Sequence, residues 1–301
     1  MKNRSKLNKW TTFDTIITIV AVLVCVITLY PMLYVLSCSI SDPLQVLAGN
    51  VVLLPKGFSL DAYKLVMVDP AFWRSFANSI FYVVASCVLM FFTTVAIAYP
   101  LTRPNLKFRR PLTYFLLIPM FFGGGMIPTF IVVTKLGLYN SVWAMILPTC
   151  YSIWNIILCR TFMASLSNEL VESATIDGCN QFQTLLKIIL PLSKPVIAVI
   201  MIYTIVGVWN SWFNASIYTT NADIQPVQLY MKNALSATTT TASAMVDKLP
   251  IEMQQRYRDM AMAGNQIKYA MIVITTLPIV FVYPMFQKHF TKGMMLGSLK
   301  G

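Results

Sequence analysis

The stretch "ESATIDGCNQFQTLLKIILP" at 172–191 holds two acids, a glycine, an amphipathic run and a terminal proline. Glu172 offers a carboxylate that could pair with a cation on another molecule. The small Ser173 and Ala174 beside it permit close approach, and Gly178 suits the left-handed position that ends a helix. These residue types indicate binding to a partner rather than bond breaking.

Catalytic signatures are missing from the sequence. There is no G-x-x-x-x-G-K-[ST] loop, no H-E-x-x-H and no G-x-S-x-G, and the one histidine, His289, lies in a basic terminal segment. We expect no enzymatic role, no metal site and no cofactor bound by this chain. Without CxxC pairs, cysteines beside apolar runs are expected to pack as small apolar residues. They are Cys25, Cys38, Cys87, Cys150, Cys159 and Cys179.

Composition indicates an integral membrane protein. The 301 residues are 57% hydrophobic and 11% charged, with mean hydropathy +0.66, whereas a soluble domain has about a quarter charged residues. The net charge of +12 is attributed to cytoplasmic loops and not to nucleic-acid binding. The fold class expected is all-α, with six transmembrane helices that could each cross about 30 Å of hydrocarbon. Their predicted spans are 13–37, 76–99, 112–133, 139–159, 196–217 and 269–286.

The distribution of Lys and Arg predicts that both termini are cytoplasmic. With the N-terminus inside, positive charge is about twice as dense on the cytoplasmic side, and "RPNLKFRRP" at 103–111 is the strongest single indicator. The chain then divides into a cytoplasmic segment 1–12, a six-helix transmembrane domain 13–287 and a cytoplasmic tail 288–301. Within the domain, 160–194 forms a cytoplasmic loop and 217–268 an extracellular one. The first span lacks a cleavage site and is expected to be retained.

Helix signals predict a helix–turn–helix within the cytoplasmic loop. Ser167 or Asn168 can cap a first helix that stops at Asp177 and Gly178. A second helix, "NQFQTLLKIIL", is predicted to place its apolar residues on one stripe and to end at prolines. Those stripe residues are Phe182, Leu185, Leu186 and Ile189, and the prolines are Pro191 and Pro195. On residue types alone, this pair could merely connect two spans.

One predicted span is interrupted, and another carries polar residues. "IPMFFGGGMIPTF" at 118–130 places glycines and prolines where they break or kink a helix. This could be a packing kink or a hinge of a transport pathway. In "GVWNSWFNAS", Trp209 and Asn210 could tie helices together, meet a polar ligand or form an interface belt. No span has an internal acid or base, which argues against an ion-coupled carrier.

The cytoplasmic stretch resembles the "EAA" loop of ABC importer permeases. That pattern is E-A-A, three residues, G, nine residues, I-x-L-P, and Ser173 in place of the first Ala is the single departure. The ending "FQKHFTKGMMLGSLKG" resembles the tail of the maltose-type permease subunit. "FFGGGMIPTFIVVTKLGLYNSVWAMILP" at 121–148 is similar to the carbohydrate-uptake branch typified by the LplC and YtcP permeases.

The resemblance implies a permease subunit of a binding-protein-dependent importer of oligosaccharides, in the cell membrane of a Gram-positive bacterium. Its implied partners are a second, LplB-like permease, two ATPase subunits that carry ATP and Mg²⁺, a lipid-anchored sugar-binding protein and membrane lipid. Residues implied in ATPase coupling are Glu172, Ser173, Ala174, Asp177, Gly178, Phe182, Ile188, Leu190 and Pro191. Candidates for the translocation path are Asn78, Tyr82, Trp209 and Asn210.

The outer segment after the fifth span is the expected contact with the binding protein, within 217–236. The Thr-rich tract 234–244 has no assigned role, and Pro250 is predicted to start a short polar helix that ends near Gly264. The alternative function is a six-helix channel or secondary carrier that works alone.

Overall fold

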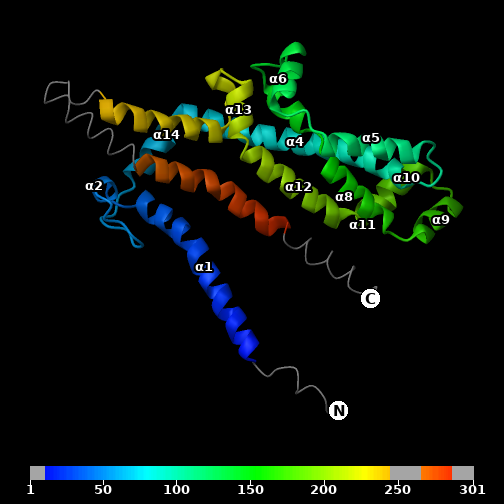
Figure 1. The fold of residues 1–301 in the computed structure, drawn as a ribbon, viewed down its shortest axis with the longest axis horizontal. Coiled ribbons are helices and arrows are strands. Elements are labelled where there is room, and N and C mark those ends of the chain that lie inside the picture. The colour runs from blue at the N-terminus through cyan, green and yellow to red at the C-terminus, as the bar shows by residue number, and fades with distance from the viewer. Residues whose placement is uncertain (1–10, 245–265, 287–301) are drawn as a thin grey trace. The chain divides into compact units, whose positions relative to one another are not determined.

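The computed structural model describes residues 11–244 and 266–286, and all regular secondary structure in these residues is helical (Figure 1). They contribute to two compact units, Met1–Asp69 with Ala234–Ile274, and Pro70–Asn233 with Thr275–Gly301. Most of the predicted segment 1–12, the helix predicted from Pro250 to Gly264 and the tail 288–301 lie outside the described residues.

The first unit is built around the end of a long apolar helix, α1 (Thr12–Ser39). Thr11 and Asp14 form a capping box at its start, and its burial begins only in the last turn. There, short helices α2 (Pro43–Leu47) and α3 (Asp61–Val68) follow, and Cys38, Val46 and Val51 form a small core. The buried amide of Gln266 donates to the backbone oxygens of this region, with a 2.6 Å bond to Ser41.

The second unit is organised along α4 (Pro70–Thr102), against which α8 (Ile153–Ala164) and α12 (Lys194–Trp209) pack. Small hydroxyl residues recur on the buried face of α4 and permit close helix approach. The core between these helices includes Met90, Ala98, Tyr99, Ile156, Cys159, Met163, Ile189, Val196 and Ile200.

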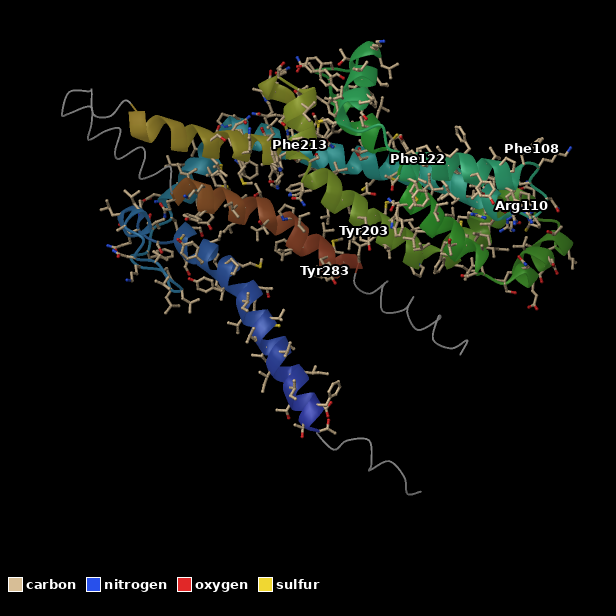
Figure 2. All side chains as sticks on the ribbon, in the orientation of Figure 1. Phe108, Arg110, Phe122, Tyr203, Phe213 and Tyr283 are labelled. Atoms are coloured by element: carbon tan, nitrogen blue, oxygen red, sulfur yellow. The ribbon has the colours of Figure 1, made fainter. Side chains whose placement is uncertain are left out.

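Large apolar side chains remain exposed over much of the second unit, as expected for a surface that meets lipid or other subunits. Phe122, Tyr203 and Phe213 are examples that project from the ribbon, with exposed fractions of 79%, 57% and 51% (Figure 2).

Three helices are long and apolar enough to cross a membrane: α1, α4 and the helix Gln266–Phe286. Up to three more candidate spans arise if bent helix pairs are counted as one span each. The described residues therefore support a helical membrane protein with three to six candidate spans.

The predicted third span, 112–133, is two helices rather than one. α5 (Arg109–Phe121) and α6 (Met126–Lys135) meet at an angle of 111°. Gly125, at the break, has φ +80° and ψ −173°, a conformation available essentially to glycine alone. The interruption expected from the glycine run is confirmed.

The predicted fourth and fifth spans are also broken, which the sequence analysis did not specify. α7 (Val142–Ile146) and the 3₁₀ turn η1 (Leu147–Thr149) meet α8 at 41°. In the predicted fifth span, α12 ends at Trp209, and α13 (Trp212–Tyr218) follows after a break of two residues. The Ser152 hydroxyl caps the start of α8, and the Asn210 side chain donates to Val206 O at the end of α12.

The predicted outer segment is more ordered than its sequence suggested. After the short 3₁₀ turn η3 (Ala222–Ile224), helix α14 runs from Val227 to Ala244 and includes the Thr-rich tract. Buried Val227 and Leu229 fix its start, and the preceding Pro226 is a helix-start signal that the sequence analysis overlooked.

Candidate docking sites at the two ends of helix α4

The first candidate site begins with helix α9 (Asn168–Ile176). The Ser167 hydroxyl accepts a 3.2 Å bond from the Glu169 amide at the start of the helix. At its end Gly178 has φ +79°, with bonds from the Gly178 amide to Thr175 O and from the Cys179 amide to Ala174 O. Both bonds define a Schellman motif. The predicted cap, first helix and glycine turn are confirmed.

The second helix of the pair begins with a capping box between Asn180 and Gln183. α10 (Gln181–Thr184) leads into a π-helical turn, η2 (Leu185–Ile189), and then α11 (Leu190–Leu192). Pro191 was expected to end this helix, but helical structure continues to Leu192. A proline in the first turn of α11 needs no amide donor there, so it is tolerated.

The predicted apolar stripe on the second helix is only partly correct. Ile189 is fully buried, whereas Phe182 and Leu186 are 67% and 47% exposed. A π turn inserts an extra residue per turn and so rotates the side chains that follow it relative to those before it. Ile188 and Leu190 are half-buried. Phe182 and Leu186 consequently form an apolar surface that no described residue of the chain covers.

Residues of α9 that were grouped by sequence divide between two faces of the helix. Glu172, Ser173 and Asp177 are exposed, whereas Ala174 is 3% exposed and faces the protein interior. Positions two residues apart differ by about 200° around a helix, so Glu172 and Ala174 cannot face the same partner. Ile176, at 86% exposure, adds a large apolar side chain to the open surface.

A groove with a volume of about 890 Å³ separates α9 from the end of α4, and Glu172 and Ile176 line it. The Tyr99 hydroxyl donates to the backbone and side-chain oxygens of Gln181, at 3.1 and 3.0 Å. The Arg103 guanidinium lies 4.7 Å from the centre of the Tyr99 ring, a cation–π contact. The helix pair is thus joined to the end of α4 that precedes the basic cluster 103–111.

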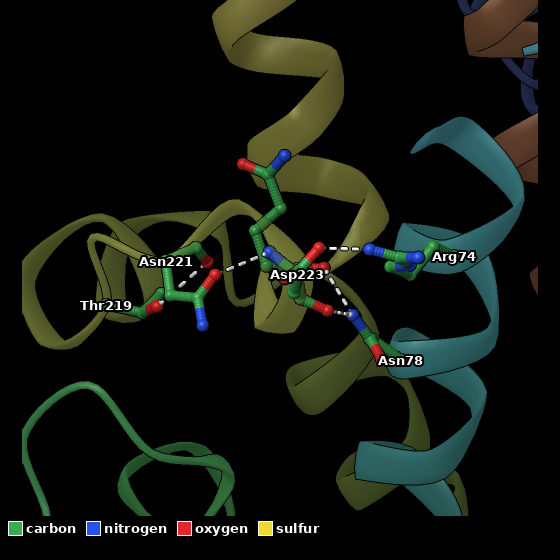
Figure 3. A network of polar contacts seen from close by, with 6 residues as sticks. Arg74, Asn78, Thr219, Asn221 and Asp223 are labelled. Carbon is green, nitrogen blue, oxygen red and sulfur yellow. Dashed lines mark hydrogen bonds and ion pairs between the residues drawn. The ribbon is translucent and has the colours of Figure 1, made fainter. Parts of the chain in front are cut away.

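The second candidate site is a short backbone segment, residues 219–227, here termed the strap (Figure 3). Arg74 pairs with Asp223, and the Asn78 amide donates to the backbone oxygens of Asp223 and Gln225 at 2.7 and 3.2 Å. The buried Tyr82 hydroxyl donates to Ile224 O at 2.6 Å. The three α4 residues are four apart, so they form one row along the helix.

Asn140 holds the other end of the strap. Its side-chain oxygen accepts from the amides of Thr220 and Asn221, at 3.0 and 2.9 Å, and from the Thr219 hydroxyl. Asn140 has φ +58°, a left-handed conformation that Asn tolerates better than most residues. The sequence analysis did not select Asn140, Arg74 or Asp223, although the turn sequence "GLYN" indicated such a position for Asn140.

The four predicted translocation-path residues differ in what they contact. Asn78 and Tyr82 bind the strap. Trp209 is 4% exposed, and its ring nitrogen donates to Thr275 O at 3.1 Å. Asn210 is exposed, and its amide donates to Val206 O at 3.0 Å. Of the four, Asn210 alone presents an exposed side chain.

The two sites lie toward opposite ends of α4. A helix of 33 residues is about 50 Å long, and Asn78 and Tyr99 are separated by about 30 Å along it. This separation matches the thickness of the hydrocarbon core of a bilayer. Among the described residues no group of three or more His, Cys, Asp or Glu could hold a metal ion. The two sites are thus about one bilayer core apart along α4.

The class of protein defined by this fold is a multi-helix membrane component. A family model described as "Binding-protein-dependent transport system inner membrane component" matches residues 7–296. The chain belongs to this family.

Two Bacillus subtilis (strain 168) proteins are among its relatives. "Protein LplC" is 40% identical over 278 residues, which cover 91% of this chain and 90% of the relative. "Polygalacturonan/rhamnogalacturonan transport system permease protein YtcP" is 36% identical over 301 residues, the full length of both. The predicted resemblance to these permeases is confirmed.

A solved structure gives the same result at the level of the fold. A chain from the "bacterial ABC transporter involved in the import of the acidic polysaccharide alginate" has a TM-score of 0.82 and 32% identity, and the match covers 94% of this chain and 99% of that one. A chain from an alginate transporter in complex with an "alginate pentasaccharide-bound periplasmic protein" shares the fold with a TM-score of 0.53 at 15% identity.

Proposed function

We propose that the chain is the permease subunit of a binding-protein-dependent ABC importer that takes up an oligosaccharide. It forms the translocation path together with a second permease, and its partner ATPases hydrolyse ATP. The observation that carries this proposal is the full-length match to a polygalacturonan and rhamnogalacturonan permease, together with the alginate importer fold. A carrier or channel that works alone is not favoured by these relatives.

The proposed orientation places the helix pair of residues 168–192 in the cytoplasm. The groove is lined both by residues of this pair and by Arg103, the first residue of the basic cluster 103–111. Positively charged loops are retained on the cytoplasmic side, so the helix pair shares that side. The strap, toward the other end of α4, is then extracellular. In this orientation both termini are cytoplasmic and the chain crosses the membrane six times.

The helix pair is proposed to dock in a cleft of an ATPase subunit. Its open surface combines the Glu172 carboxylate with exposed Ile176, Phe182 and Leu186. Exposed ion pairs contribute only about 0–1 kcal/mol, whereas truncating one partner of a desolvated interfacial pair costs about 2–5 kcal/mol. Glu172 is therefore expected to matter only when it is covered by the partner.

Gly178 provides the experiment that tests this function. Its φ of +79° is tolerated by Asn and Asp as well as Gly, and a Cβ there would meet no atom within 4 Å. Gly178→Asn and Gly178→Asp therefore carry a similar backbone strain at the turn and differ in charge. An unpaired charge buried in an interface is strongly unfavourable.

We expect Gly178→Asp to abolish ATP-driven oligosaccharide uptake, while Gly178→Asn retains most of it. Both variants should reach the membrane at wild-type abundance, measured by quantitative immunoblotting of membrane fractions. Normal uptake by Gly178→Asp would refute docking at this turn.

The strap is proposed to contact the extracellular sugar-binding protein. Its backbone is fixed from two sides, by α4 and by Asn140, so it presents a preformed surface. Preformed surfaces lose less conformational entropy on binding. The measurement that tests this proposal is the affinity of the assembled permease for the binding protein, which should fall when the strap is loosened.

A further inference from the structure

Residues 40–59 of the first unit form a closed loop immediately after α1 that contains the short helix α2, and its returning segment 51–58 is here termed the hairpin. The chain pairs with itself through a bridge between Ser41 and Phe58, and the Asp42 amide donates to Lys56 O at 3.0 Å. Gly57 has φ +65°, and a Cβ on it would come within 2.9 Å of the Asp42 Cβ. This turn therefore needs glycine, and its shape is fixed by the backbone.

The hairpin folds back beside α1. The Ser37 hydroxyl, in the last turns of that helix, donates to Leu53 O at 2.5 Å. The Ser41 hydroxyl in turn accepts from the Lys56 amide at 3.1 Å. The hairpin is consequently held beside the end of α1, a candidate membrane-spanning helix.

Large apolar side chains gather on this hairpin and are exposed. Their exposed fractions are 60% for Val52, 47% for Leu53, 74% for Leu54 and 75% for Phe58. The apolar surface is continuous with α1, because residues of its last turns such as Leu33 and Leu36 are also 45% exposed. Contiguous apolar groups on a surface normally mark contact with a membrane or a partner.

We propose that the hairpin 51–58 is a lipid anchor that inserts Leu54 and Phe58 into the bilayer at the point where α1 emerges. Lys56, between them, extends its amine toward the lipid headgroups while its stem lies along apolar surface. Lipid is favoured over a protein partner because the Ser37 bond holds the hairpin beside the end of α1, an apolar helix long enough to span the bilayer.

Nitroxide labelling of the full chain in phospholipid nanodiscs tests this proposal. In a background without the six native cysteines, Leu54→Cys and Phe58→Cys each receive one label at an exposed position. Collisions with oxygen, which partitions into lipid, are compared with collisions with a water-soluble nickel chelate. Ile27→Cys, at mid-α1 and 62% exposed, is the lipid control, and Lys64→Cys on α3 is the water control.

We expect labels at 54 and 58 to give an oxygen-to-nickel collision ratio several-fold above that at 64 and close to that at 27. A ratio equal to that at 64 would show that the hairpin faces water, and would overturn the proposal. Immobile labels shielded from both reagents would overturn it too, because they would indicate a protein interface. The readout needs no transport, so it is separable from the proposed function.

Discussion

At the residue scale, polar side chains on α4 hold backbone rather than line an open cavity. Tyr82 is 1% exposed, and its hydroxyl donates to the Ile224 carbonyl of the strap. The Arg74–Asp223 pair is largely exposed on both sides, and exposed pairs contribute at most about 1 kcal/mol. The buried bond of Tyr82 is therefore expected to contribute more to strap position than the ion pair.

Tyr82→Phe tests this role. The substitution leaves the Ile224 carbonyl without its donor, which costs about 1–3 kcal/mol for a buried group. We expect a lower thermal unfolding temperature in detergent and weaker binding of the sugar-binding protein to the assembled importer. Tyr203→Phe on α12 is the matched control, because the Tyr203 ring is 57% exposed and its hydroxyl has no hydrogen-bond partner among the described residues. A lower unfolding temperature with unchanged affinity for the sugar-binding protein would show that the strap does not take part in docking.

At the element scale, breaks in the helices follow from backbone chemistry at a few positions. The 111° turn between α5 and α6 depends on Gly125, whose φ and ψ are closed to residues with a Cβ. Gly123 and Gly124 are adjacent, but neither has a positive φ. One glycine of the three therefore carries the conformational requirement.

Gly125→Ala is expected to destabilise the break by about 1–3 kcal/mol, the cost of a residue held in a disallowed backbone region. Gly123→Ala is the control, because a Cβ there meets no atom within 4 Å and no left-handed conformation is needed. The thermal unfolding temperature in detergent and the uptake rate should both fall for Gly125→Ala, and neither should fall for Gly123→Ala. Equal behaviour of the two variants would show that the bend does not depend on Gly125.

At the scale of the whole molecule, α4 connects a helix pair toward one end with the strap toward the other. Tyr99 and Gln181 join α4 to the helix pair, and Asn78 and Tyr82 join it to the strap. In the proposed orientation, α4 would be a physical route by which movement at the cytoplasmic helix pair could reach the extracellular strap.

Energy coupling is testable on the intact importer. The predicted spans contain no internal acid or base to carry protons, so uptake should continue when an uncoupler collapses the proton gradient while ATP is maintained. Depletion of ATP should stop it. Radiolabelled oligosaccharide uptake into proteoliposomes loaded with ATP measures both, and loss of uptake on addition of the uncoupler alone would favour the stand-alone carrier.

Local chemistry by itself determined much of the coupling element. Capping residues, the glycine turn and the EAA spacing depend on neighbours within a few positions, so Ser167, Gly178 and the limits of α9 were predictable. The break near Gly125 was predictable for the same reason. Composition and the placement of Lys and Arg predicted a membrane protein with several spans. A long apolar segment in hydrocarbon satisfies its backbone hydrogen bonds by forming a helix.

Only the tertiary structure decided which side of each helix meets the protein. Ala174 faces inward, Phe182 faces outward just before the π turn, and Asn78 and Tyr82 bind a segment about 145 residues away. In an apolar chain, hydrophobic periodicity cannot separate a core face from a lipid face, because both are apolar. Contacts between residues distant in sequence therefore had to be seen in three dimensions. They show that the polar row on α4 binds the backbone of the strap.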